Sequence, residues 1–361
     1  MADLGPRIAV VGAGGFVGNR MVEVLNLDLR WPVRPVARRA SGLALAARFA
    51  LDGRVANAMD HQRLKEALDG CEVVVHAVAG DSATIIGSVE PVYTAAAAAG
   101  CRRLVYLSSA MVHGQSPTAG TDEGSPLPRD QRLPYNLAKR EAERRLFKLA
   151  ERGKVEAVAL RPGIVWGPRS QWIGGLADAL LGGRAGLVDA GRGVCNAIHV
   201  DNVVHAVRLA ATVPGVAGEA FLIGEHETPS WRTFTARVAT ALGMSIEAIP
   251  TLDFEQTPPT LQERVDGWRQ SRSVQRALES LPRPLRMGLA AAWAASGALP
   301  QARPPGPQAD LEMALLHRAT HVPNWEKARR VLGYEPIMPT DEGWRRTIAW
   351  LAFAGYPVTV T

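Results

Sequence analysis

A short apolar run that leads directly into a glycine-rich turn constrains the fold of this chain more than any other feature. Residues 7–11 are rich in β-branched side chains, as a buried parallel strand is. The segment Gly12-Ala-Gly-Gly15-Phe-Val-Gly18 follows at once, and the residues after it have the apolar spacing of a helix. Glycines at 12, 15 and 18 allow a tight turn and a close approach of the backbone to a pyrophosphate. A strand, a turn and a helix in this order predict a dinucleotide-binding unit, with the helix N-terminus facing the phosphates.

Strand-like and helix-like segments alternate through the first half of the chain, which predicts βαβ units and an α/β fold with a Rossmann-type, doubly wound parallel sheet. We expect further strands near 33–37, 72–77, 103–108 and 155–160, and helices near 15–27, 60–69, 84–99 and 134–152. In the second half, Phe221-Leu-Ile223 reads as a short strand, and Thr228 or Ser230 is placed to cap a helix that ends at Gly243.

We expect two domains. Residues 1–165 form the dinucleotide-binding domain, and residues 166–361 form a smaller substrate-binding region, interleaved with the last Rossmann elements near 196–223. Residues 251–320 are rich in Pro, Arg, Gln and Ala, and we interpret them as an irregular insertion, either a lid or a segment without a direct role.

Tyr135 and Lys139 lie four residues apart on the helix expected at 134–152, so their side chains reach the same region. An ammonium beside a phenol favours the phenolate, and we expect Lys139 to lower the pKa of Tyr135 toward neutrality. Such a tyrosine can exchange a proton with a substrate oxygen. Ser109 ends the strand expected at 103–108, where it can bond the same oxygen or, alternatively, its own loop backbone.

The glycine turn, Ser109 five residues before Gly114, and the Tyr135–Lys139 pair together resemble the extended short-chain dehydrogenase/reductase family. Later segments agree in order and spacing: 160–168, 198–203 and 324–336. The likeness covers residues 7–250 and 321–352 and is nearer to the 3β-hydroxysteroid dehydrogenase and dihydroflavonol reductase type. It implies that Tyr135 is the acid/base, that Lys139 tunes it and holds the nicotinamide ribose, and that Ser109 orients the substrate oxygen.

The resemblance also implies a set of cofactor-binding residues, of which several lie in the glycine turn and the rest at the ends of later strands. They are Gly12, Gly14, Gly15, Phe16, Val17, Gly18, Arg38, Arg39, Asn57, Ala58, Ala79, Ser108, Tyr135, Lys139, Pro162, Ile164 and Val165. Asn57 stands where the family usually has an aspartate near the adenine, and its amide can still bond the adenine amino group.

The choice between NAD and NADP is indicated by the end of the second strand. An acidic residue there binds the ribose 2′-hydroxyl, whereas arginine accommodates a 2′-phosphate. The family's carboxylate position falls at Ala37, and Arg38 and Arg39 follow it. We therefore predict NADP as the cofactor, with NAD as the alternative.

The substrate is expected to be largely apolar. Nucleotide-sugar members of the family carry an asparagine where Ile164 stands, and an arginine where Cys195 or Asn196 stands. Arg161 and Arg192 are the residues that could still reach a diphosphate. Ala110 and Met111 replace the acid/base pair of the dehydratases. We predict an NADP-dependent alcohol dehydrogenase or ketone reductase; the alternatives are a nucleotide-sugar epimerase, a non-catalytic NADP-sensing protein and a structural protein.

Composition and charge exclude several other partners. The net charge of +6 is modest for 361 residues and the arginines are scattered, so we expect no nucleic-acid partner. The longest apolar stretch, 287–299, is too short to cross a bilayer. Three cysteines show no disulfide or metal spacing, and His199, Asp201 and His205 read as a strand-end histidine and a helix cap rather than a metal site. We expect a cytoplasmic protein that binds a small molecule and forms a homodimer through the helices near 84–99 and 134–152.

Overall fold

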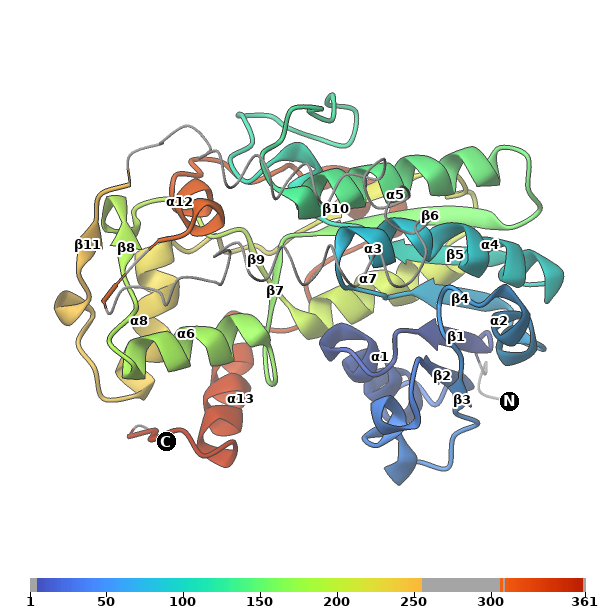
Figure 1. The fold of residues 1–361 in the computed structure, drawn as a ribbon, viewed down its shortest axis with the longest axis horizontal. Helices are drawn as coiled ribbons and strands as arrows, with labels where there is room; N and C mark the ends of the chain where they lie inside the picture. Colours follow the sequence, from blue (N-terminus) through green and yellow to red (C-terminus); the bar gives the residue numbers. More distant parts are fainter. Residues whose placement is uncertain (1–4, 255–305, 308, 360–361) are drawn as a thin grey trace, which may run out of the picture.

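The computed structural model describes residues 5–254, 306–307 and 309–359, and a seven-stranded parallel sheet lies at its centre (Figure 1). The strand order is β10-β6-β5-β4-β1-β2-β3, so the chain runs outward in both directions from the neighbouring strands β1 and β4. This reversal point, at the carboxyl ends of the strands, is where doubly wound sheets bind ligands. The strands are β1 (Ile8–Val11), β2 (Val33–Ala37), β3 (Arg54–Val55), β4 (Val73–His76), β5 (Arg103–Leu107), β6 (Glu156–Pro162) and β10 (Ala220–Ile223).

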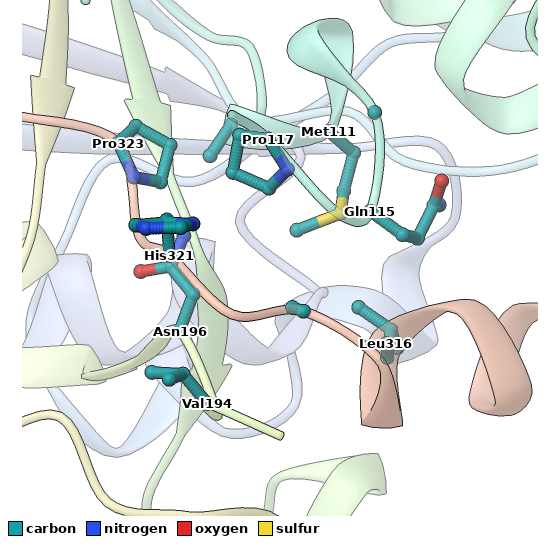
Figure 2. A pocket seen from close by; sticks show the side chains of 11 residues that line it. Met111, Gln115, Pro117, Val194, Asn196, Leu316, His321 and Pro323 are labelled. Carbon is teal, nitrogen blue, oxygen red and sulfur yellow. The ribbon is translucent and has the colours of Figure 1, made fainter. Parts of the chain in front are cut away.

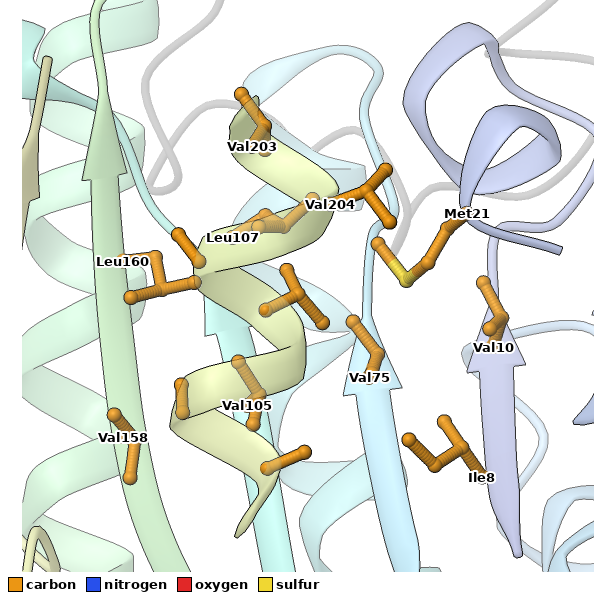
Figure 3. Close-up of a cluster of buried hydrophobic side chains, with 14 of the residues drawn as sticks. Ile8, Val10, Met21, Val75, Val105, Leu107, Val158, Leu160, Val203 and Val204 are labelled. Carbon is orange, nitrogen blue, oxygen red and sulfur yellow. The ribbon is translucent and has the colours of Figure 1, made fainter. Parts of the chain in front are cut away.

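Helices cover both faces of the sheet because the central strands are apolar on both sides. Alternate residues of β1 show this: Ile8 and Val10 join one buried cluster, and Ala9 and Val11 join the other. On the first face lie α1 (Phe16–Leu27) and α7 (Val200–Thr212), whose Val203 and Val204 lie over strand residues in Figure 3. The second face is covered by α2 (His61–Leu68), α3 (Ser82–Gly87), α4 (Val89–Ala98) and α5 (Pro134–Ala150).

A third apolar cluster, outside the sheet, holds the C-terminal elements beside the carboxyl ends of the strands. Aromatic contacts dominate it; the rings of Trp166 and Trp344 stack with centroids 4.4 Å apart, and Phe234 meets Trp344 edge to face. Its elements are β7 (Ile164–Trp166), α6 (Gln171–Leu181), β8 (Leu187–Val188), β9 (Ala197–His199), α8 (Trp231–Ala241), α12 (Leu311–His317) and α13 (Thr340–Phe353). The short strand β11 (Thr251–Leu252) pairs with β8.

The predicted Rossmann-type fold is confirmed, with strands and helices close to their expected positions. Ser230, not Thr228, caps α8 by accepting a hydrogen bond from the Thr233 amide, 3.0 Å away. The single helix expected at 84–99 is wrong: two helices, α3 and α4, meet at Ser88. Ser88 is fully buried and bonds His76, 3.0 Å away, so tertiary packing sets this junction.

Most of the predicted insertion at 251–320 lies outside the described residues, and the domain division at 165/166 stays a prediction. The described end of that segment forms α12, whose residues Glu312 and Leu316 line the main cleft. Within the described residues, no helix has both the length and the apolar character needed to cross a membrane.

Candidate active site

A cleft of about 1210 Å³ opens at the carboxyl ends of the strands, beside the reversal point between β1 and β4. Its size is enough for a dinucleotide and a small second ligand, since drug-sized ligands occupy roughly 300–1,000 Å³. Every catalytic and cofactor-binding residue predicted from the sequence lines this one cleft. Their shared location comes from the sheet, which brings the ends of β1, β2, β4, β5 and β6 together.

The glycine turn forms one wall of the cleft. Gly12 has a φ of +98°, and a Cβ atom there would lie only 2.7 Å from the carbonyl oxygen of Ala77. A Cβ on Gly18 would overlap the Gly12 carbonyl, so the turn and α1 pack as closely as the motif predicts. Gly15 caps α1 without a side-chain hydrogen bond, and the first turn of α1 holds no acidic residue. The first amides of α1 therefore have no side-chain acceptor, which suits them to bind a pyrophosphate.

At the other side of the cleft, β5 ends at Leu107 and is followed directly by Ser108 and Ser109, both buried. The Oγ of Ser109 accepts a hydrogen bond from the Met111 amide, 3.2 Å away, and so caps the short helix Ala110–His113. The hydrogen bond between Ser109 and its own loop backbone, which was the alternative expected from the sequence, is thus present. Because that bond uses only a lone pair, the Ser109 hydroxyl proton stays available for an acceptor in the cleft.

Tyr135 and Lys139 occupy the first two turns of α5, which begins with Pro134 in its favoured position. Lys139 is buried, and its Nζ donates to the carbonyl oxygen of Leu107, 2.7 Å away. The same Nζ lies 5.9 Å from the centre of the Tyr135 ring. Burial lowers the pKa of Lys139 to about 8.

The expected lowering of the Tyr135 pKa is wrong for the structure as it stands. Although 39% of the Tyr135 surface is exposed along the cleft, the protein atoms packed around the phenol desolvate it and raise its pKa. A hydrogen bond with Ser109 opposes this rise, and the negative charge of Glu312 adds to it. Burial is the largest cause of this rise, and the Nζ of Lys139 lies 5.9 Å from the centre of the Tyr135 ring and donates to the Leu107 carbonyl instead of to the phenol oxygen.

The adenine end of the cleft lacks a carboxylate at the end of β2. Arg38 and Arg39 follow Ala37 there; both are exposed, both line the cleft, and neither side chain forms a hydrogen bond or ion pair with another described residue. Asn57 lines the same end and uses its Oδ1 to accept a hydrogen bond from the Met59 amide, 3.1 Å away. Its side-chain amide nitrogen has no partner in the described part of the chain, as an adenine contact would require.

The substrate end of the cleft is largely apolar. Ile164 and Met111 line it together with side chains that sequence reasoning missed: Trp172 at the start of α6, and Glu312 and Leu316 of α12. Cys195 is completely buried outside the cleft, and Asn196 lines a separate, smaller cavity. No sequence motif marks α12, so only the fold could place Glu312 and Leu316 here.

The two arginines weighed as diphosphate ligands do not face the cleft. Arg161 is buried in β6 and paired with Glu143 of α5, and its Nη1 also meets the Nε2 of His113, 3.1 Å away. Arg192 is exposed and is not among the residues that line the cleft. A different arginine, Arg169, does line it. It directly follows the predicted 160–168 segment, and that adjacency is a signal which could have identified it.

Figure 2 shows the smaller cavity, which lies behind the substrate end and has a volume of about 10 Å³, room for roughly one water molecule. Met111 and Leu316 line both this cavity and the main cleft, so they form the partition between the two. The far side of the cavity is lined by Gln115, Asn196 and His321 among apolar neighbours. The partition therefore limits how far a substrate can extend past Ser109.

His199 and Asp201 have structural roles, and their predicted assignment is partly wrong. His199, not Asp201, caps α7: its Nδ1 accepts a hydrogen bond from the Asp201 amide, 3.2 Å away. The Asp201 carboxylate is paired instead with Arg20 of α1, at 2.6 Å. Across the ranges that the structure describes, no group of three or more His, Cys, Asp or Glu side chains is placed to hold a metal ion.

A sequence model of the family described as "NAD dependent epimerase/dehydratase family" matches residues 8–224. The chain belongs to this family. The match covers the sheet, the glycine turn and all three predicted catalytic residues. It confirms the resemblance to the extended short-chain dehydrogenases/reductases.

Two curated relatives share most of the chain. A 4-hydroxy-2-methyl-3-oxo-4-farnesyl-3,4-dihydroquinoline-1-oxide ketoreductase from Stigmatella aurantiaca is 28% identical over 93% of this chain and 94% of its own. A 3 beta-hydroxysteroid dehydrogenase/Delta 5-->4-isomerase from Mycobacterium tuberculosis is 29% identical over 93% of this chain and 88% of its own. With the family match, they support the prediction of an NAD(P)-dependent enzyme of the dehydrogenase/reductase type.

A solved structure confirms the fold. The dTDP-glucose 4,6-dehydratase DesIV from Streptomyces venezuelae, with NAD and TYD bound, has a TM-score of 0.69 and 19% identity. The alignment covers 96% of this chain and 97% of that one.

Proposed function

We propose that this protein is an NADP-dependent oxidoreductase that interconverts a ketone and an alcohol on a largely apolar small molecule. The observation that carries the proposal is the grouping of Ser109, Tyr135 and Lys139 in one cleft with an apolar substrate end. The similarity to a ketoreductase and to a hydroxysteroid dehydrogenase supports the same reaction class. When bound, the nicotinamide cofactor supplies or accepts the hydride.

The side chains of the chain itself provide proton transfer and orientation. In ketone reduction, the Tyr135 hydroxyl gives its proton to the carbonyl oxygen as the carbon gains hydride, and the oxygen becomes an alcohol. The Ser109 hydroxyl, capping its loop through a lone pair, donates a hydrogen bond to that oxygen and stabilises the developing negative charge. Lys139 places a buried cation 5.9 Å from the centre of the Tyr135 ring and eases formation of the phenolate once the proton has left.

The raised pKa of Tyr135 favours the reductive direction. A phenol whose pKa lies above its ordinary value of about 10 is fully protonated at neutral pH, and reduction needs the protonated form. The rate of reduction should stay level through neutral pH, begin to fall near pH 8 as Lys139 loses its charge, and fall further when the phenol ionises in more alkaline solution. Alcohol oxidation needs the phenolate as base and should rise over that same alkaline range.

NADP is proposed as the preferred cofactor because two exposed arginines, and no carboxylate, follow β2 at the ribose end of the cleft. The glycine turn fits the pyrophosphate, since a Cβ at Gly12 or Gly18 would collide with neighbouring backbone. Lys139 and Tyr135 would hold the nicotinamide ribose, and the backbone of 162–165 would lie beside the nicotinamide.

A nucleotide-sugar substrate is disfavoured by the same geometry. Ile164 offers no hydrogen bond at the substrate end, and Arg161 is neutralised by Glu143 away from the cleft. A diphosphate brought there would have poorly paired charge, which is costly to bury. The proposed homodimer through α3, α4 and α5, and a cytoplasmic location, stay predictions.

The proposal is tested by following nicotinamide absorbance while the pure protein is offered apolar ketones with NADPH, and sugar nucleotides with NAD. We expect ketone-dependent oxidation of NADPH and no conversion of UDP- or TDP-sugars. Conversion of a sugar nucleotide without net change in the nicotinamide would instead establish an epimerase.

A further inference from the structure

Arg169 occupies an unusual position beside the first turn of α1. It lies between β7 and α6 with a φ of +73°, a backbone conformation that is uncommon for any residue but glycine. Its Nη1 donates to the Oδ1 of Asn19, 2.5 Å away, and Asn19 is almost completely buried in α1. Since Gly15, Phe16, Val17 and Gly18 line the same cleft, the guanidinium is held next to the amides that begin α1.

The charges around Arg169 are not balanced by protein side chains. In the described ranges it forms no ion pair with a carboxylate, whereas the neighbouring Arg20 is paired with both Asp201 and Glu23. The positive end of the α1 dipole points to the same place, and the first turn of α1 holds no acidic residue. Two positive centres side by side are unfavourable unless an anion lies between them.

The other charged residues of the cleft do not supply that anion. Among its lining side chains the carboxylates are Asp81 and Glu312. Asp81 caps α3 by accepting from the Thr84 amide, 2.7 Å away. Glu312 lies at the substrate end on α12, where its charge acts on Tyr135.

We propose that Arg169 binds the pyrophosphate of the dinucleotide beside the first amides of α1, with Asn19 fixing its orientation. This inference rests on the cofactor use proposed above. A guanidinium suits the role because its planar array of N–H donors can bond Asn19 and a phosphate oxygen together. Because NAD and NADP share the pyrophosphate, Arg169 contributes equally to the binding of both, in contrast to Arg38 and Arg39.

The test is calorimetric titration of the purified full-length protein with NADP⁺, NAD⁺ and adenosine 2′,5′-bisphosphate, which lacks a pyrophosphate. Arg169→Asn removes the charge and keeps a residue that tolerates positive φ. We expect it to weaken NADP⁺ and NAD⁺ by the same factor, roughly 10- to 100-fold, from the loss of a charge-assisted hydrogen bond. Binding of the bisphosphate should be unchanged. Arg192→Asn, at an exposed arginine outside the cleft, is the matched control and should bind all three ligands as the wild type does.

Arg169→Lys provides a second test, which holds even if Arg169→Asn does not fold. Thermal unfolding of both variants checks that they are folded. Arg169→Lys keeps the charge but loses the forked donors, so both cofactors should weaken by a smaller, equal factor. Unchanged cofactor affinity in Arg169→Asn, or a loss confined to NADP⁺, would overturn the inference. If the wild type itself binds no dinucleotide, the proposed function fails first, so the two failures are distinguishable.

Discussion

Replacing Arg38 and Arg39 together with glutamine should convert an NADP-preferring protein into one with little preference. Both guanidiniums are exposed, line the cleft and are not bound to other described residues, so their loss should leave the fold intact. A charge-assisted hydrogen bond contributes about 1.5–3 kcal/mol when shielded. Solvent screening at this exposed end reduces that to about 1 kcal/mol for each arginine. The two together then give about 2 kcal/mol, or roughly 30-fold in the dissociation constant of NADP⁺.

The assay is calorimetric titration of NADP⁺ and NAD⁺ into the double variant at low and at high salt. NADP⁺ should weaken by that factor and NAD⁺ should change by less than about two-fold, because only NADP⁺ carries the 2′-phosphate. The difference between variant and wild type should shrink at high salt, since exposed charges are screened. Arg48→Gln, which removes an exposed arginine paired with Glu23, serves as the control. Equal losses for the two cofactors would refute the assignment of the 2′-phosphate to these arginines.

Met111→Ala should join the small cavity to the main cleft, because Met111 forms part of the partition between them. Turnover of ketones with a longer apolar chain should then rise relative to turnover of short ones. Comparing kcat/KM across a chain-length series checks this, and an unchanged ranking would show that the substrate does not extend in this direction. Glu312→Gln should move the alkaline fall in the reduction rate to lower pH, because the negative charge of Glu312 raises the pKa of Tyr135. The pH profile of kcat/KM measures this shift. Asp310→Asn, which preserves the cap of α12, is the control. An alkaline fall at the same pH in Glu312→Gln as in the wild type would mean that Glu312 does not act on the phenol.

The parts of the fold that the sequence predicted well are those with a strong local pattern. The strands β1, β2, β4, β5 and β6 are apolar runs flanked by turn residues, and the glycine turn requires a close helix–strand contact wherever it occurs. The two-residue strand β3 has no such pattern, because both of its residues are exposed at the edge of the sheet. The break at Ser88 depends on a buried contact with His76, which lies twelve residues earlier in the chain and leaves no local signal.

The candidate site shows the same division. Motif residues such as Ser109 and Tyr135 were found because their spacing is typical of a known chemistry. Glu312 and Leu316 come from a helix near the C-terminus and reach the cleft only through tertiary packing. The direction of the Tyr135 pKa was missed for a related reason. Spacing on a helix places Lys139 near the phenol, but only the structure shows that the phenol is desolvated and that Lys139 donates to the Leu107 carbonyl.

Turnover of Tyr135→Phe tests the central claim most directly, since this change removes only the ionisable oxygen. Calorimetry with NADPH should show at most a roughly ten-fold loss of affinity, because only the hydrogen bond from the phenol to the nicotinamide ribose is removed while the ring and the rest of the cleft are kept. Ketone reduction should fall by roughly 10²- to 10⁴-fold, the usual cost of removing a positioned proton donor. A variant that is saturated with NADPH and retains more than about a tenth of the wild-type rate would contradict the assignment of Tyr135 as the catalytic acid.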